Sequence, residues 1–391
     1  MGTPRVVVVG AGVIGLSCGW RLAEAGLDVT VVDPAPGSGA SSVAAGMLAP
    51  MTEAHPTEAA LLRLSLASAL RYPRFVADLE DLTGLEVGYR TSGTLVTALD
   101  AADEAQLAVL AGHLERLGLA AEPLTGRACR EAEPALSSDT RAGLLVPEDH
   151  SVDNRALVRA LLSAVDRSGA RLVAARVAAI DCGGEHVSGE HASGVVRGVV
   201  LDSGESLSAD VVVVAAGCRS ADLHPRLRGL VRPVKGEVLR LRRTPGALPL
   251  DRTVRAQVAG RSVYLVPRDN GELVVGATQL EAGFDTTVRA GAVHALLRDA
   301  RLVVPSVDEY TLAESAAGLR PGSPDNTPLL GAIGPDGLLV ATGHHRDGIL
   351  LAPITADTIV ELATLGTTPG HASDVSPRRF IPGGQRCSER S

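Results

Sequence analysis

The chain has 391 residues, of which 45% are hydrophobic, enough to bury a large core in two or three domains. Its formal net charge is -8, and no lysine- and arginine-rich block with interleaved aromatic residues occurs, which argues against a nucleic-acid partner. No apolar run of about 18 residues and no secretion signal occur, and the five cysteines are widely spaced, so we expect a cytoplasmic protein with reduced thiols, no membrane span and no metal site.

The N-terminal segment RVVVVGAGVIGLSCGWRLAEAGLDVTVVDP predicts a strand, a glycine loop, a helix and a second strand. In order, these are a strand at 6–9, the GxGxxG glycines Gly10, Gly12 and Gly15, a helix from about 14 to 25, and a strand at 27–32 that ends in Asp33. Such glycines allow a tight turn, a close approach to a pyrophosphate and close helix packing, and the helix N-terminus attracts phosphate. A strand-end acid can accept hydrogen bonds from both hydroxyls of an adenosine ribose. We therefore predict a dinucleotide site, with NAD and FAD both still open.

Three further segments bear on which dinucleotide binds. Residues 34–50, PAPGSGASSVAAGMLAP, have mostly small side chains, which is typical of backbone lying against something flat or charged, although a flexible loop is the alternative. A buried strand is expected at 211–215, ending near Gly217, and LLVATGHHRDGILLAPITADTIVELATL predicts a strand, a glycine turn and an apolar helix starting near Gly348. In two-domain flavoproteins such a late strand returns to the nucleotide domain, and an inward helix N-terminus can stabilise a negatively charged reduced flavin. These segments favour FAD.

The remaining segments predict a second domain. Strand-like segments at 89–99 and 232–244 accompany the hairpin RSVYLVPRDNGELVVGAT, which turns at 268–271, while 59–84 and 101–118 have the spacing of amphipathic helices. We expect a mixed α/β protein with a Rossmann-like FAD-binding domain at 1–85, 142–230 and 311–365, and a mainly antiparallel-sheet substrate domain at 86–141 and 231–310. Residues 182–194 suit a long hairpin loop better than a metal site, and the tail 366–391 is expected to be mobile.

Six motifs occur in the order VGAGVIG, SSVAAGMLAP, RPVKGE, VYLVPRDNGELVVGAT, AGLRPGSPDNTPLLG and GHHRDGILLAP. From about Arg5 to Leu365 the sequence thereby resembles the FAD-dependent D-amino-acid oxidase and sarcosine oxidase family, and the last four motifs favour its glycine oxidase branch, which serves thiamine biosynthesis. The resemblance implies FAD, a small amino acid such as glycine as substrate, O2 as electron acceptor and a homo-oligomer. We expect the FAD to be non-covalent because no cysteine lies in the GHHRDGILL turn.

The resemblance also implies roles for single residues. Arg320 matches the arginine that binds the substrate carboxylate bidentately, with a structural ion pair as the alternative. Tyr264 matches a tyrosine that donates to the same carboxylate, with a half-buried strand residue as the alternative. Arg346 matches an arginine that could serve the flavin, the substrate or only its loop. The expected FAD contacts are Gly10, Gly12, Val13, Ile14, Gly15, Asp33, Pro34, Ala40, Ser41, Ala45, Gly46, Met47, Val177, Gly217, His344, His345, Arg346, Asp347, Gly348, Ile349 and Leu350.

Four residues leave finer questions open. His344 and His345 are adjacent in a turn, so we expect one of them to face inward and neither to be a catalytic base. Gln279 and Ser262 stand where the family pattern has a methionine and a histidine, which leaves the preference among glycine, sarcosine and small D-amino acids open.

Other functions also remain open at this stage. One is an FAD dehydrogenase that passes electrons to a quinone or a protein partner, and another is a flavin-binding subunit without catalysis, which Arg320 and Tyr264 together disfavour. Within the enzyme class the alternatives are a D-amino-acid or sarcosine oxidase, or a relative that uses the glycine imine in secondary metabolism.

Overall fold

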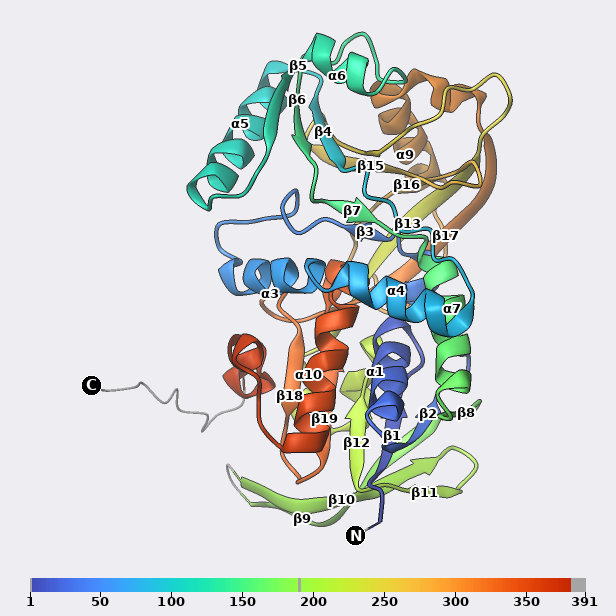
Figure 1. Cartoon of the computed structure of the whole chain (residues 1–391), viewed down its shortest axis with the longest axis vertical. Coiled ribbons are helices and arrows are strands. Elements are labelled where there is room, and N and C mark those ends of the chain that lie inside the picture. Colours follow the sequence, from blue (N-terminus) through green and yellow to red (C-terminus); the bar gives the residue numbers. More distant parts are fainter. Residues whose placement is uncertain (1, 189–190, 381–391) are drawn as a thin grey trace, which may run out of the picture.

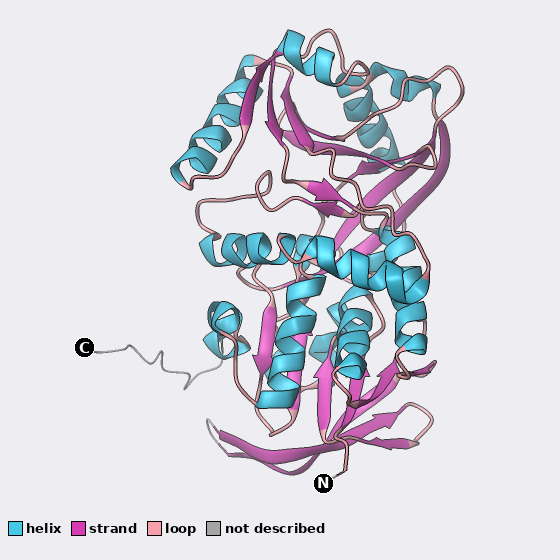
Figure 2. Cartoon of the chain, in the orientation of Figure 1, coloured by secondary structure: helices cyan, strands magenta, loops and turns pink. Residues whose placement is uncertain are grey.

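The structure, a computed structural model, describes residues 2–188 and 191–380 (Figure 1). Its strands fall mainly into two large sheets, which occupy the lower and the upper half of the view (Figures 1 and 2). The expected mixed α/β class is therefore confirmed.

The first sheet is mostly parallel. Within the described residues it has six strands in the order β18-β19-β12-β1-β2-β8. Their bounds are Leu329–Ala332 (β18), Leu338–Thr342 (β19), Val211–Val214 (β12), Arg5–Val9 (β1), Asp28–Val32 (β2) and Arg171–Val173 (β8). Neighbouring strands are parallel except β18 and β19. Segments far apart in the sequence thus lie side by side, as expected for a discontinuous nucleotide domain.

Both faces of the first sheet are covered, which explains why β1 reads as an unbroken valine run. Val6 and Val8 pack with the helices on one face, whereas Val7 and Val9 face the small sheet β11-β10-β9 on the other. The covering helices are α1 (Val13–Glu24), α7 (Asn154–Arg167) and α10 (Ala352–Leu365), and the small sheet consists of β9 (Val177–Ser188), β10 (His191–Leu201) and β11 (Ser206–Ser208). Against these helices pack α3 (Ala59–Ala69) and α4 (Tyr72–Thr83), which cross the middle of the view (Figure 2).

The second sheet is mostly antiparallel. Among the described residues it has eight strands in the order β17-β13-β16-β15-β14-β4-β6-β5. Their bounds are Thr311–Gly322 (β17), Arg232–Arg242 (β13), Glu272–Gly276 (β16), Arg261–Pro267 (β15), Thr253–Val258 (β14), Thr94–Ala98 (β4), Ala142–Val146 (β6) and Glu122–Thr125 (β5). The predicted hairpin is β15 and β16, which pair in antiparallel fashion. The helices α5 (Ala101–Arg116), α6 (Gly126–Ala132) and α9 (Ala290–Val303) accompany this sheet, and α9 contributes Leu296 and Val303 to its core.

Four details differ from the sequence-based expectation. Strands β6 and β17 pair in the second sheet, although the expected boundaries at 142 and 311 group them with the first. The apolar helix α10 begins at Ala352 rather than near Gly348, because 345–347 form a 3-10 turn. Residues 182–188 and 191–194 belong to the paired strands β9 and β10 rather than to a loop. Residues 370–380 form two short 3-10 helices with Ala372 and Val375 buried, whereas the rest of the expected mobile tail, 381–391, lies outside the described residues.

No helix in the described part of the chain is long and apolar enough to cross a membrane.

Candidate active site

A cavity of about 940 Å³ opens between the two sheets, and both contribute to its walls. One wall is formed by the loop between β1 and α1, the short helix α2 (Ala40–Val43), the end of β12 and the turn at 345–347. The other wall comes from β13, β14, β15 and β17. A cavity of this size, shared by two layers, suits a cofactor with a small substrate beside it.

The glycine loop has the geometry that its sequence predicts. Gly10 has a φ of +109°, and a Cβ there would lie 2.4 Å from the carbonyl oxygen of Ala215. A Cβ on Gly15 would lie 1.8 Å from the oxygen of Gly10, so Gly15 serves the packing of α1 and does not line the cavity. Gly12 caps α1 without a side-chain hydrogen bond. The Val13 amide donates to the Ser41 hydroxyl at 3.0 Å, which leaves the later amides of the first turn available to an anion.

Asp33 lies at the cavity wall after β2, as predicted. Its Oδ2 accepts a hydrogen bond from the Ala11 amide at 2.7 Å, and its Oδ1 accepts one from the Ala35 amide at 2.7 Å. Because each carboxylate oxygen can accept a further bond, the residue can brace the loop and still hold a ribose.

Nearly all residues predicted to form the site are brought together. Those that line the cavity are Gly10, Gly12, Val13, Ile14, Asp33, Pro34, Ala40, Ser41, Ala45, Gly46, Met47, Val177, Gly217, Tyr264, Arg320, His344, His345, Arg346, Asp347, Gly348 and Ile349. The exceptions are Gly15 and Leu350. Leu350 is 2% exposed, packs in the core beside the first sheet, and accepts a hydrogen bond from Ser68 through its carbonyl oxygen.

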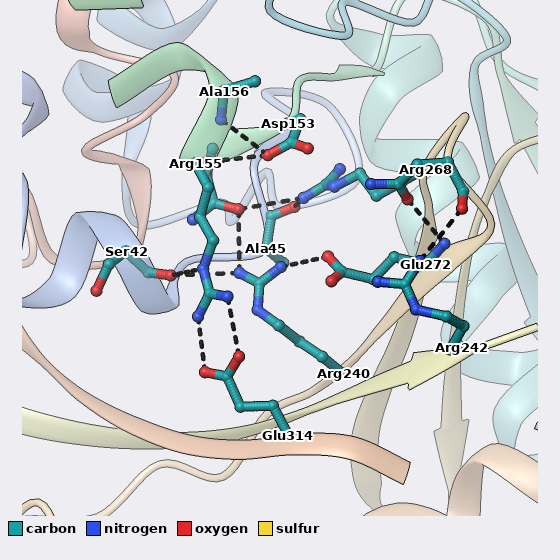
Figure 3. A network of polar contacts seen from close by, with 12 residues as sticks. Ser42, Ala45, Asp153, Arg155, Ala156, Arg240, Arg242, Arg268, Glu272 and Glu314 are labelled. Atoms are coloured by element: carbon teal, nitrogen blue, oxygen red, sulfur yellow. Dashed lines mark hydrogen bonds and ion pairs between the residues drawn. The ribbon is translucent and has the colours of Figure 1, made fainter. Parts of the chain in front are cut away.

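The small-residue segment 40–47 is held in place by polar side chains behind it (Figure 3). Arg155 donates to the Ser42 oxygen at 2.9 Å, Arg268 donates to the Ala45 oxygen at 2.5 Å, and Asn154 donates to the Ser41 oxygen at 2.7 Å. Arg155 is itself fixed by two hydrogen bonds, of 2.9 and 2.7 Å, to Glu314 of β17. The segment is therefore an ordered wall that joins the two sheets, and the flexible-loop alternative does not hold.

Arg320 projects from β17 and carries a charge that no carboxylate in residues 2–188 and 191–380 neutralises by an ion pair. Its Nη1 donates a hydrogen bond to the Thr278 carbonyl oxygen at 3.3 Å, and its side chain also hydrogen-bonds that of Tyr264. Burial raises the pKa of the nearby Tyr264 hydroxyl, and Arg320 partly offsets this rise. A guanidinium without an acid partner beside a buried hydroxyl has the donors that a carboxylate ligand needs.

Two glycines make room for this pair. A Cβ on Gly236 of β13 would lie 2.3 Å from Nη1 of Arg320, and a Cβ on Gly276 of β16 would lie 2.3 Å from the Tyr264 hydroxyl oxygen. Both side chains therefore lie flat across the sheet over a neighbouring strand that has no side chain at that point. The motifs RPVKGE and VVGAT contain these glycines, but the sequence alone does not indicate what they accommodate.

Arg346 is paired, unlike Arg320. It contacts Glu53 at 2.7 Å and Glu58 at 2.8 Å, and Glu53 also pairs with Arg255 of β14 at 2.5 Å. Burial alone would lower the pKa of Arg346, but Asp347 and these two glutamates raise it overall. Arg346 was expected to serve the flavin, the substrate or only its loop, and the ion pairs in the structure are those that hold the loop. Glu53 and Arg255 were missed in the sequence because their pairing joins segments about 200 positions apart.

Comparison with known proteins assigns the family. Residues 5–362 match the family described as "FAD dependent oxidoreductase". The chain belongs to this family. A glycine oxidase from Geobacillus kaustophilus is 33% identical over 95% of both chains, and the structure of a glycine oxidase from that organism superposes with a TM-score of 0.85, covering 96% of this chain and 99% of that one. The resemblance drawn from the motifs is confirmed.

Two further relatives have other names. The bifunctional protein ThiO/ThiG of Nostoc sp. is 35% identical over 92% of this chain and 52% of its own length. The chain thus spans about half the length of this relative. The hydrogen cyanide synthase subunit HcnC of Pseudomonas aeruginosa is 28% identical over 97% of both chains.

The residues present fit the FAD of this family. Gly10 and Gly12 leave the backbone open to a pyrophosphate. His345 also lines the cavity, and the two buried nitrogens of its ring have no hydrogen-bond partner within the described residues. Cys218 also lines the cavity, but burial raises the pKa of its thiol to about 12, so the protonated thiol is a poor nucleophile for covalent attachment. No group of acids, histidines and cysteines in the described residues has the arrangement of a metal site.

The turn after β19 contributes two histidines and an acid. His344 contacts Thr355 at 3.0 Å, and burial lowers its pKa to about 3. Burial and the charge of Arg346 lower the pKa of His345 to about 4. Both residues contribute to the cavity wall, and the ring of His344 is directed to Thr355 of α10. Both rings are neutral near pH 7. Burial, followed by Glu53, raises the pKa of Asp347 to about 7.

The two departures from the family pattern lie at the cavity. Gln279 and Ser262 both line it, and Ser262 accepts a hydrogen bond of 2.7 Å from Gln257. They add polar groups to the wall on the side of Tyr264.

Gly236→Ala tests the placement of Arg320. The added methyl group would lie against the guanidinium of Arg320, at the end of a long side chain, so we expect a folded protein whose KM for its substrate rises at least about ten-fold. Gly246→Ala is the matched control, because a Cβ there meets nothing within 4 Å. Steady-state kinetics of both variants, with thermal melting, check the prediction. An unchanged KM in Gly236→Ala would show that the arginine need not lie across the strand.

Asp347→Asn tests the buried acid. Because the folded-state pKa of about 7 lies above the ordinary 3.8, the contribution of Asp347 to stability is complete below about pH 4 and is lost as the pH rises through 7. The amide does not ionise, so the melting temperature of the variant relative to the wild type should increase from pH 5 to pH 8. Glu133 and Asp149, whose pKa values burial also raises, are present in both proteins and cancel in the difference. A pH-independent difference contradicts the prediction.

Proposed function

We propose that the protein is a glycine oxidase. It oxidises the amine of glycine to an imine that reacts with water to give glyoxylate and ammonia. A similarly small amino acid, such as sarcosine or a small D-amino acid, would be oxidised to its own imine in the same way. The observation that carries this proposal is Arg320, an arginine without an acid partner beside Tyr264 in a cavity that fits FAD. FAD supplies the acceptor for the hydride leaving Cα and passes the electrons to O2, giving hydrogen peroxide.

The side chains of this chain have a positioning task in that reaction. The guanidinium of Arg320 and the hydroxyl of Tyr264 hold the carboxylate, which fixes Cα in one place and one orientation. Burial keeps His344 and His345 neutral. The hydrogen on Cα leaves together with both bonding electrons, as a hydride, so no base has to remove a proton from Cα. A dedicated catalytic base is therefore unnecessary if the substrate amine reacts in its neutral form.

Similarity to glycine oxidases over nearly the whole chain supports the same substrate class. Similarity to ThiO/ThiG supports a role in which the imine is passed on to thiazole assembly for thiamine biosynthesis. HcnC, named as a subunit of hydrogen cyanide synthase, is the relative that favours another fate of the glycine imine, in secondary metabolism.

Arg320→Ala and Arg320→Lys test the proposal together. Loss of a desolvated bidentate contact should lower kcat/KM for glycine in the alanine variant by an amount equivalent to about 3 to 5 kcal/mol of transition-state stabilisation. Lysine should restore only part of this loss. FAD content and melting temperature should stay near wild type, because no acid in the described residues is left unpaired. Oxygen consumption with glycine, sarcosine and small D-amino acids provides the measurement.

Two outcomes would contradict the proposal. Retained glycine oxidation with a lowered melting temperature would make Arg320 a structural residue. Reduction of FAD by these amino acids with little oxygen consumption would instead point to a dehydrogenase that uses another acceptor.

A further inference from the structure

The cavity wall holds a second arginine next to the proposed carboxylate site. Arg255 of β14 is paired in register with Tyr264 of β15, and directly opposite residues of an antiparallel pair project from the same face of the sheet. Tyr264 in turn lies beside Arg320, and all three line the same cavity. The second sheet therefore presents cation, hydroxyl and cation in a row.

The two cations differ in what already binds them. Arg320 has no ion-pair partner in the described residues, whereas Nη1 of Arg255 lies 2.5 Å from Oε1 of Glu53. The other oxygen of Glu53 lies 2.7 Å from Nε of Arg346. Burial would raise the pKa of Glu53, but the two arginines lower it overall, so it is ionised at neutral pH.

Glu53 is the one acid, within the described parts of the chain, that forms an ion pair with Arg255. Arg346 is different, because it keeps Glu58 at 2.8 Å if Glu53 is lost. Removing the charge of Glu53 would thus free Arg255 far more than Arg346. The Glu53 side chain is 14% exposed and that of Arg255 is 20% exposed, so solvent screens this pair only in part.

We propose that Glu53 is a specificity-determining residue that occupies Arg255 and thereby restricts the site to amino acids with a single carboxylate. This inference rests on the proposed function, since it takes Arg320 as the site of the first carboxylate. When Arg320 holds the first carboxylate of a ligand, a second carboxylate meets the negative charge of Glu53, and the cation on the other side of Tyr264, Arg255, is already paired. Selectivity of this kind comes from a repulsive group as much as from an attractive one.

The test compares ligands with one and two carboxylates. Dissociation constants of acetate, malonate and succinate are measured from the change in the visible spectrum of the bound FAD, and glycine oxidation is measured separately by oxygen consumption. In Glu53→Gln we expect malonate or succinate to bind at least about ten-fold more tightly relative to acetate than in the wild type. The double variant Glu53→Gln/Arg255→Gln should lose this gain.

Glu58→Gln is the matched control, because it removes an acid from Arg346 without touching Arg255. Its ratio of dicarboxylate to acetate affinity should match the wild type. An unchanged ratio in folded, FAD-loaded Glu53→Gln overturns the inference, and so does a gain that persists in the double variant.

Arg255→Gln covers the case in which Glu53→Gln does not retain FAD. With Glu53 present and one cation fewer, the dicarboxylates should bind still more weakly relative to acetate, and an unchanged or improved ratio contradicts the inference. Absence of glycine oxidation in the wild type, with the ligand ratios behaving as expected, would overturn the proposed function and leave the role of Glu53 in place.

Discussion

The unneutralised charge of Arg320 is the feature on which the site depends. A guanidinium in a partly desolvated cavity is costly without an anion, yet no carboxylate in the described residues forms an ion pair with it. The surrounding sheet is adapted to this residue, because Gly236 leaves space for its side chain and Gly276 leaves space for that of Tyr264. Such an arrangement is understandable if the missing partner is a substrate carboxylate.

Three other arginines around the substrate side of the cavity are balanced by acids of the protein. Glu53 and Glu58 compensate Arg346, Glu53 also compensates Arg255, and Glu314 compensates Arg155 behind the small-residue segment. Two of these pairs, Glu53 with Arg255 and Arg155 with Glu314, link segments beside the first sheet to strands of the second. They therefore help to fix the distance between the two walls of the cavity and the electrostatic potential inside it. Among the arginines beside Tyr264, these pairs leave Arg320 as the one without an acid partner in the described residues.

The parts of the site that were predictable depend on local sequence. The glycine loop, the position of Asp33 and the hairpin with Tyr264 could each be predicted, because the spacing of neighbouring residues indicates the local structure. Gly236 and the pairing of Glu53 with Arg255 depend on register between distant strands and on contacts across two sheets, which no local pattern encodes. For the same reason β6 and β17 were grouped with the wrong sheet, since a strand's partner is set by the fold and not by its own residues.

The account is tested most directly by a crystal structure of the FAD-loaded protein with glycolate, a carboxylate of the size of glycine that lacks its amine. We expect both carboxylate oxygens within hydrogen-bond distance of the Arg320 guanidinium, the Tyr264 hydroxyl on one of them, and the Glu53 ion pairs with Arg255 and Arg346 intact. Glycolate bound to Arg255 or Arg346 in place of Glu53, with no contact to Arg320, would contradict the central claim.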